Sequence, residues 1–174
     1  STSTAVINST GGATNQTDGK IVVAGTTSID AGTGDLSLNQ ANNNFGGAVS
    51  LNSTGGAVSI TDVDAAILGT STFGKGTLTV NAVGITQTGA ITQAADAGAA
   101  TFNAGAGVIT LDSANDFTGS VSLNNLGAND VAVTDINTIA LGVSSVGTGA
   151  LAVTAGVGIT QAGAITQAAT AGVA

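Results

Sequence analysis

A block of fifteen residues occurs twice in this chain. Residues 84–98 read GITQTGAITQAADAG and residues 158–172 read GITQAGAITQAATAG, so thirteen of fifteen positions are identical. A repeat this long and this faithful is typical of chains that stack copies of one supersecondary unit. It constrains the fold more than any single residue does, and it predicts a scaffold.

Nearly the same offset relates the rest of the chain. The segment Thr4–Asn8 (TAVIN) matches Thr77–Asn81 (TLTVN), and Phe45 matches Phe117 at an offset one shorter, which places a one-residue slip in a turn. We therefore predict one domain, residues 1–174, made of a partial repeat (1–28) and two full repeats (29–101 and 102–174).

Short strands fill each repeat. Segments such as Ala48–Asn52 and its counterpart Ser120–Asn124 alternate apolar with small polar residues, and this period of two predicts strands with one buried face. The surface residues are Thr, Ser, Asn and Gly, with no Glu and no Arg. Because those residue types form helices poorly, we expect almost no helix.

A right-handed parallel β-helix fits this long period best. We divide each repeat into three coils with boundaries near Ile29, Ala48, Thr77 and Thr101, and predict about seven coils in all. Proline is absent, as expected where each coil needs the backbone N–H groups of its neighbour, and the 27 glycines suit tight corners. A left-handed helix needs a six-residue period, which is seen only within GITQTGAITQAA.

The charge argues against some partners. The net charge is −8, with only two cationic residues, so we expect no nucleic-acid partner. No apolar run approaches the roughly 18 residues of a membrane helix, so we expect no transmembrane segment. The chain has no Cys, so the redox compartment cannot be inferred from disulfides.

Several blocks resemble a known family. Ala114–Leu123 (ANDFTGSVSL), Asp130–Gly142 (DVAVTDINTIALG) and Gly158–Gln167 (GITQAGAITQ) are similar to the β-strand repeats of large bacterial exoproteins related to filamentous haemagglutinin. The resemblance covers essentially the whole chain. It implies a β-helix stalk, export across a Gram-negative outer membrane, an extracellular or cell-surface location, and a role in adhesion, biofilm or fibre formation. The secretion domain of such exoproteins is not in this sequence.

The two ends are the predicted self-association edges, because uncapped solenoid turns expose strand edges that pair with other chains. We expect end-to-end stacking, or continuation within a longer chain, through Ser1, Thr2, Ser3, Thr4, Thr170, Ala171, Gly172, Val173 and Ala174.

The chain offers little catalytic chemistry, and we expect no enzyme. It has no His, Cys, Glu or Arg, so Asp62 and Asp64 are the best acid–base pair, and in the second repeat they become Asp135 and Asn137. We expect no cofactor. Calcium is the alternative, with Asp62, Asp64 and Asp135 as candidate ligands, joined by Asn115 and Asp116. Against calcium, the Gly-Gly-x-Gly-x-Asp repeat is absent, and Asn42, Asn43 and Asn44 suit corners that satisfy backbone groups.

The predicted function is structural: a segment or subunit of an extracellular bacterial fibre or adhesin that gives reach, surface attachment and self-association. The alternative is an ice- or glycan-binding β-helix, in which host or matrix glycans would be partners. It depends on outward threonines: Thr77 and Thr79 become Ala150 and Ala152 in the second repeat, whereas Thr86 and Thr92 recur as Thr160 and Thr166. Asn8, Asn15 and Asn52 lie in Asn-x-Ser/Thr triplets, to which we give little weight.

Overall fold

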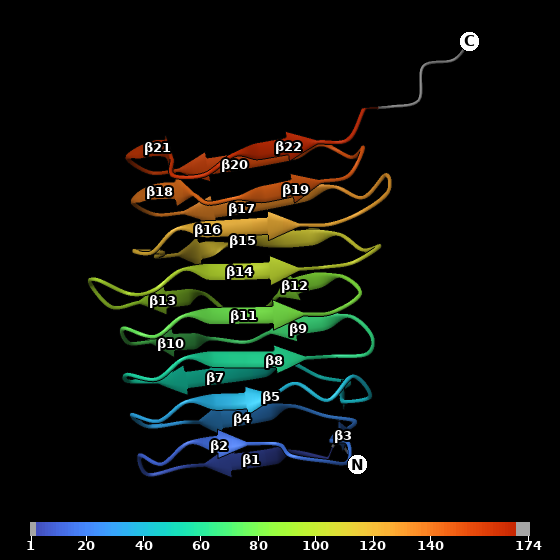
Figure 1. Ribbon diagram of the computed structural model, residues 1–174, viewed down its shortest axis with the longest axis vertical. Coiled ribbons are helices and arrows are strands. Elements are labelled where there is room, and N and C mark those ends of the chain that lie inside the picture. The colour runs from blue at the N-terminus through green and yellow to red at the C-terminus, as the bar shows by residue number, and fades with distance from the viewer. Residues whose placement is uncertain (1–2, 170–174) are drawn as a thin grey trace.

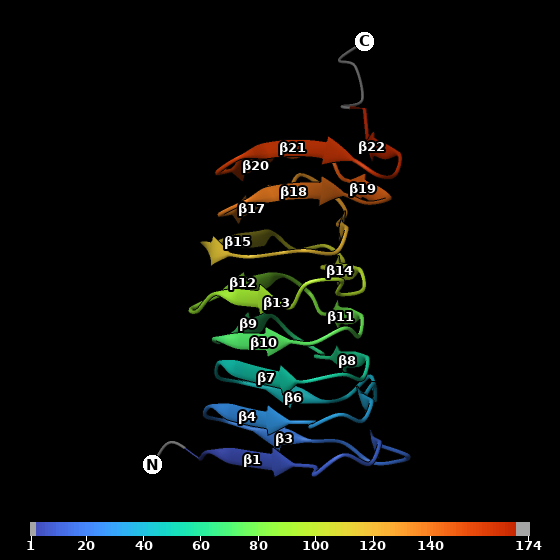
Figure 2. The same ribbon diagram turned by 90° about the vertical axis from the view of Figure 1, so that its left-hand side faces the viewer.

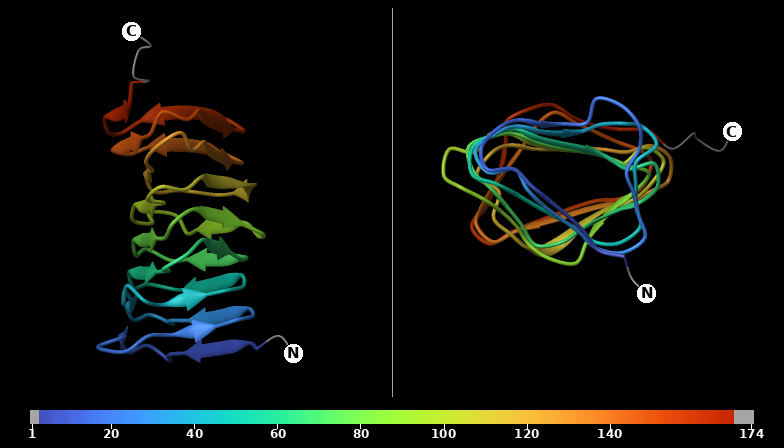
Figure 3. Two further views of the ribbon diagram at one scale, coloured as in Figure 1. Left: turned by 90° about the vertical axis from the view of Figure 1, so that its right-hand side faces the viewer. Right: turned by 90° about the horizontal axis from the view of Figure 1, so that it is seen from below.

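The computed structural model describes residues 3–169, which form a stack of parallel strands without any helix (Figure 1). The predicted all-β solenoid is confirmed. Seen along its axis, the turns enclose one core, and the chain winds clockwise as it recedes from the viewer, which makes the solenoid right-handed (Figure 3). Within these residues no helix has the length and apolarity needed to span a membrane.

Two ten-stranded parallel sheets form the main walls, and Figure 2 shows their strands stacked turn upon turn. We call them sheet A and sheet B. Sheet A contains β1 (Ala5–Asn8), β4 (Thr27–Asp30), β7 (Val49–Ser53), β9 (Ala66–Leu68), β10 (Ser71–Phe73), β12 (Ile85–Gln87), β13 (Ile91–Gln93), β15 (Ile109–Asn115), β17 (Val131–Asp135) and β20 (Leu151–Ala155).

Sheet B faces sheet A across the core, and a two-stranded sheet closes part of the third side. Sheet B contains β2 (Thr14–Asn15), β5 (Leu36–Leu38), β8 (Val58–Thr61), β11 (Leu78–Asn81), β14 (Ala100–Asn103), β16 (Val121–Asn124), β18 (Thr138–Leu141), β19 (Ser144–Val146), β21 (Gly158–Gln161) and β22 (Ile165–Gln167); the third sheet pairs β3 (Val22–Val23) with β6 (Asn44–Phe45).

The core consists of columns of similar side chains, one residue from each turn. In sheet B, Leu36, Val58, Leu78, Ala100 and Val121 lie in register and are each at most 2% exposed. The rings of Phe102 and Phe117 pack edge to face, with their centroids 6.0 Å apart. Alternation of apolar and polar residues therefore builds the continuous core that the sequence predicts.

The number of coils differs from the prediction. The register of sheet A places Thr27 directly above Ala5, and Ile85 directly above Ala66. Fewer residues separate Ala66 from Ile85 than separate Ala5 from Thr27, so the turns differ in length. The solenoid has about eight turns with ~21-residue spacing, not seven longer ones. Stacked turns must enclose similar cross-sections, but the corners between strands vary in length. The number of turns therefore could not be derived from the length of the sequence repeat alone.

One sequence repeat consequently spans three and a half turns rather than three. The repeat-related strands β1 and β11 lie in sheets A and B respectively, as do β12 and β21, which carry the two GITQ blocks. Each structural feature of the repeat therefore recurs on the opposite wall of the solenoid.

Candidate functional site

The predicted carboxylates lie at corners and bind backbone amides. Asp62 is 4% exposed; its Oδ2 accepts the N–H of Phe45 at 3.3 Å and its Oδ1 accepts the N–H of Asp64 at 3.1 Å. The equivalent Asp135, 1% exposed, accepts the N–H groups of Phe117 and Asn137, each at 2.7 Å. Each carboxylate thus joins its own corner to the turn below.

A second polar pair flanks each of these carboxylates, and its members exchange roles between repeats. Asn44 donates to Asp64 Oδ2 at 2.8 Å, whereas in the next repeat Asn137 donates to Asp116 Oδ1 at 3.1 Å. One amide and one carboxylate are present in both cases, so the two facing partners never carry two negative charges. This exchange explains why the Asp62 and Asp64 pair is not repeated in the sequence.

Burial is the largest influence on the Asp62 carboxyl, and it raises the pKa of that group above 3.8. The N–H groups of Asp64, Phe45 and Val63 oppose the rise in pKa, and the Asp64 carboxylate adds to it. The group is a buried structural acceptor whose charged form is disfavoured.

No group of three acidic, His or Cys side chains suited to a metal ion occurs in residues 3–169. Asp62 and Asp64 share one corner, but Asp135 is on the opposite wall, three and a half turns along. Asn115 is occupied by the hydrogen bonds described next. The calcium hypothesis thus has no assembled ligand set to support it here, and it stays a prediction.

Two buried asparagines form reciprocal amide pairs with glutamines of the turn below. Asn43 Nδ2 donates to Gln16 Oε1 at 2.8 Å, and Gln16 Nε2 donates back to Asn43 Oδ1 at 2.9 Å. Asn115 and Gln87 make the same two bonds, both at 2.9 Å. We call each pair an amide clamp.

Each clamp also satisfies backbone groups at its corner. Asn43 accepts the N–H of Ile21 and donates to the carbonyl of Leu38, and Asn115 accepts the N–H of Ile91 and donates to the carbonyl of Leu111. The predicted corner role of asparagine is confirmed at Asn43. Both glutamines were missed; the recurrence of GITQ was a signal for Gln87, but Gln16 lies outside any such block.

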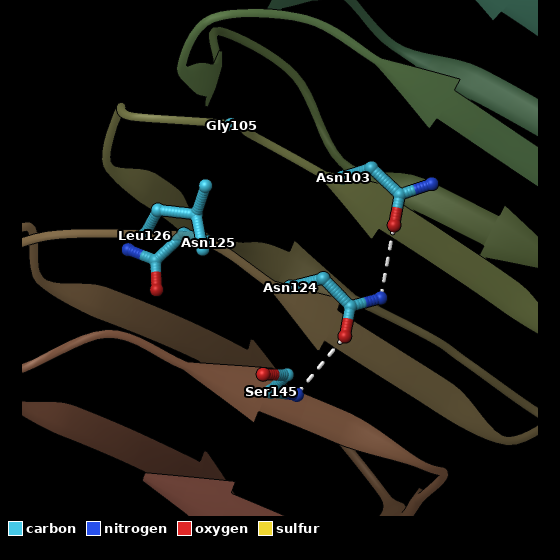
Figure 4. Close-up of a pocket in the computed structure, with 6 residues that line it drawn as sticks. All are labelled: Asn103, Gly105, Asn124, Asn125, Leu126 and Ser145. Carbon is cyan, nitrogen blue, oxygen red and sulfur yellow. Dashed lines mark hydrogen bonds between the residues drawn. The ribbon is translucent and has the colours of Figure 1, made fainter. Parts of the chain in front are cut away.

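Outward asparagines form a ladder on sheet B (Figure 4). Asn124 donates to Asn103 at 2.9 Å, and Asn103 donates to Asn81 at 2.8 Å. At the upper end, the N–H of Ser145 donates to Asn124 Oδ1 at 2.9 Å. A surface pocket of about 200 Å³ lies beside the ladder, lined by Asn103, Gly105, Asn124, Asn125, Leu126 and Ser145.

The predicted threonine array is separated by the fold. Thr86 and Thr92 lie in sheet A, whereas Thr160 and Thr166 lie in sheet B. These four residues cannot form one surface, because three and a half turns rotate the second pair to the other wall. That part of the ice-binding prediction is wrong.

Of the predicted self-association edge, only Ser3 and Thr4 lie within the described residues. Both are exposed, and β1 begins directly after them at the lowest turn. Ser1, Thr2 and the segment 170–174 lie outside the described residues.

Comparison with known proteins identified a family. The family model described as "Repeats of unknown function (DUF5649)" matches residues 1–52, 55–124 and 128–174. The starts of its second and third matches are separated by the same offset as Thr4–Asn8 and Thr77–Asn81, in agreement with the period of the sequence. Neither the curated proteins nor the solved structures gave a match to this chain. The chain belongs to the DUF5649 repeat family, and its repeats build a β-solenoid.

Proposed function

We propose that this chain is a structural segment of an extracellular bacterial fibre or adhesin, in which the solenoid gives reach and rigidity. One observation carries the proposal: a single apolar core runs through every described turn, and the buried polar groups at its corners bind one another or the backbone. At about 4.8 Å per turn, eight turns span about 38 Å, so additional repeats lengthen such a rod in proportion.

The composition and the state of the buried carboxylates argue against catalysis. Seven per cent of residues are charged, and Asp is the only acidic type. Both buried carboxylates described above are engaged by backbone amides, so neither is free to exchange protons with a substrate. We therefore propose no enzymatic activity and no cofactor.

Immuno-electron microscopy of the producing cells tests this function. Antibodies raised against the purified chain are expected to label fibres on intact cells, and serum absorbed with the purified chain is expected to label nothing. Labelling that appears only after the cells are permeabilised would contradict the surface location. Labelled surface patches without any extended structure would contradict the role in reach.

Glycan binding is the second candidate, and the outer face of sheet B favours it. Two adjacent outward columns on this face carry only hydroxyl and amide side chains: Ser37, Ser59, Thr79, Thr101 and Ser122 in one, and Thr61, Asn81, Asn103, Asn124, Ser145 and Thr166 in the other. The equivalent column of sheet A contains Asp30. Uncharged donors and acceptors at regular spacing suit a polysaccharide chain.

Retention of the protein on insoluble polysaccharides tests this candidate. Replacing Thr101 by Ala on sheet B is expected to reduce retention, whereas Ser28→Ala on sheet A serves as the matched control. Equal retention of both variants and the parent would exclude a site on sheet B.

A further inference from the structure

The upper turn of the solenoid carries a third copy of the glutamine that forms the amide clamps. Gln161 matches Gln87 in the repeated GITQ block, and each ends its strand, β21 and β12 respectively. Both side chains also make the same local bond: Gln87 Nε2 donates to the Gly89 carbonyl at 2.8 Å, and Gln161 Nε2 donates to the Gly163 carbonyl at 3.0 Å. Gln161 is therefore already oriented as a clamp glutamine.

What differs is the cover above it. Gln87 lies beneath Asn115, and Ile85 beneath Ile109, so Ile85 is fully buried. The equivalent Ile159 is 54% exposed, and Gln161 is exposed as well. The same residues in the same local structure are thus covered by a further turn in one repeat and exposed in the next.

The core side chains of this turn show the same difference. Leu78 and Val80 are buried beneath Ala100 and Phe102, which pair with them in register. Their counterparts Leu151 and Val153 are only partly buried. The molecule therefore already shows which kind of turn covers a surface of this sequence. That turn carries Ala100 and Phe102, then Ile109 and Leu111, and then Asn115.

We propose that the face formed by β20, β21 and β22 is a docking platform for a further solenoid turn of the same repeat, joined in series, whose asparagine forms a third amide clamp with Gln161. This inference rests on the proposed structural function and names what the upper edge binds. The asparagine would follow Gln161 at the same separation along the chain that joins Asn115 to Gln87.

A second copy of the chain stacked end to end is the less suitable occupant. The lowest turn of the second copy would contact the platform. In that turn Ile21 occupies the position that Asn43 has one turn higher, because Val22 pairs with Asn44. An aliphatic side chain can neither donate to nor accept from the Gln161 amide. The side-chain amide of Gln161 would then be buried without a hydrogen-bond partner in the second copy.

The test extends the 174-residue chain by repeating residues 101–127 after Ala174. The copy of Asn115 then follows Gln161 at the same separation at which Asn115 follows Gln87. Hydrogen exchange of the β20–β22 amides is expected to slow by at least about tenfold in the extended chain, because edge amides become interior ones. Gln161→Ala is expected to lower the thermal midpoint of the extended chain and to leave that of the original chain unchanged. Gln87→Ala, which breaks an existing clamp, is expected to lower both midpoints.

Two results would overturn the proposal. One is exchange in β20–β22 that the extension leaves unchanged, while Gln87→Ala still lowers the thermal midpoint. The other is concentration-dependent association of the original chain in sedimentation that protects β20–β22, which would make a second copy the occupant. Both readouts are independent of cell-surface labelling, so either can fail without the structural function failing.

Discussion

At the scale of single residues, asparagine and aspartate satisfy the backbone groups of the corners, as capping residues do at the ends of a helix. Asn43 is fully buried and takes part in four hydrogen bonds, with Gln16, Ile21 and Leu38. Removing one such side chain leaves several buried partners unsatisfied, and this cost exceeds that of losing one exposed bond.

Replacing Asn43 by Ala is therefore expected to lower the free energy of unfolding by about 1–3 kcal/mol. The adjacent Asn42 is exposed and provides the matched control, Asn42→Ala, with an expected change near zero. Urea denaturation measures both variants. Equal effects at the two positions would contradict a structural role for the clamp.

Thr27 is the one buried side chain of residues 3–169 whose polar atom lacks a hydrogen-bond partner. Valine has the same shape without the hydroxyl, and the repeat-equivalent residue is Ala100, which is apolar. Thr27→Val is expected to raise the free energy of unfolding by about 1 kcal/mol. Thr101→Val, at an outward position of β14, is expected to change it little, and a stabilisation of equal size there would assign the gain to strand propensity instead.

The raised pKa of Asp62 makes one contribution to stability that depends on pH. Just above 3.8, the folded state keeps this proton while the unfolded chain has lost it, so the folded state binds more protons and stability falls as pH rises. The loss is complete once the pH exceeds the folded pKa. Below 3.8 both states are protonated and the penalty vanishes.

In Asp62→Asn this pH-dependent loss is expected to disappear. The stability of the variant relative to the parent should therefore increase as pH rises from 3.8 upward, as measured by urea denaturation at each pH. The exposed Asp112→Asn is the control for a general change in charge. Parallel pH profiles for the parent and Asp62→Asn would show that burial does not disfavour the charged carboxyl.

At the scale of elements, the corner that precedes sheet B is a column of stacked glycines. A Cβ added to Gly34 would collide with the Gly12 carbonyl, one on Gly56 with the Gly34 carbonyl, and one on Gly76 with the Gly56 carbonyl. The backbones of successive turns approach too closely there for any side chain. Gly12, at the lowest turn, has open space where its Cβ would lie.

Gly56→Ala is accordingly expected to lower the free energy of unfolding by at least about 2 kcal/mol, because the backbone of one turn must move away from the next. Gly12→Ala makes the same chemical change in the same column and is expected to be tolerated. Thermal unfolding followed by circular dichroism compares the two. Similar midpoints for both would show that the corner can expand without cost.

At the scale of the whole molecule, each turn contacts only the turn above and the turn below. Stability in such a stack is close to a sum of terms between neighbours, and the outermost turns have one neighbour each. Native-state hydrogen exchange is expected to be slowest in the central strands β8, β11 and β14 and fastest in β1, β2, β21 and β22. Uniform protection along the stack would indicate a single cooperative unit instead.

The sequence by itself determined the fold class and the repeat period. Alternation of apolar and small polar residues is a local property of strands, and the recurrence of GITQ needs no structure to be seen. The corner role of Asn43 was likewise predictable, because short amides bind nearby backbone groups.

Only the tertiary structure decided how far one repeat rotates. Whether a repeat makes three turns or three and a half depends on the length of each corner and on the cross-section that the core requires, and neither is encoded in the offset between copies. That half turn separates Thr86 from Thr160 and places Asp62 and Asp135 on opposite walls. Pairings between turns join residues that are distant in the sequence, so they follow from register in three dimensions rather than from any local pattern.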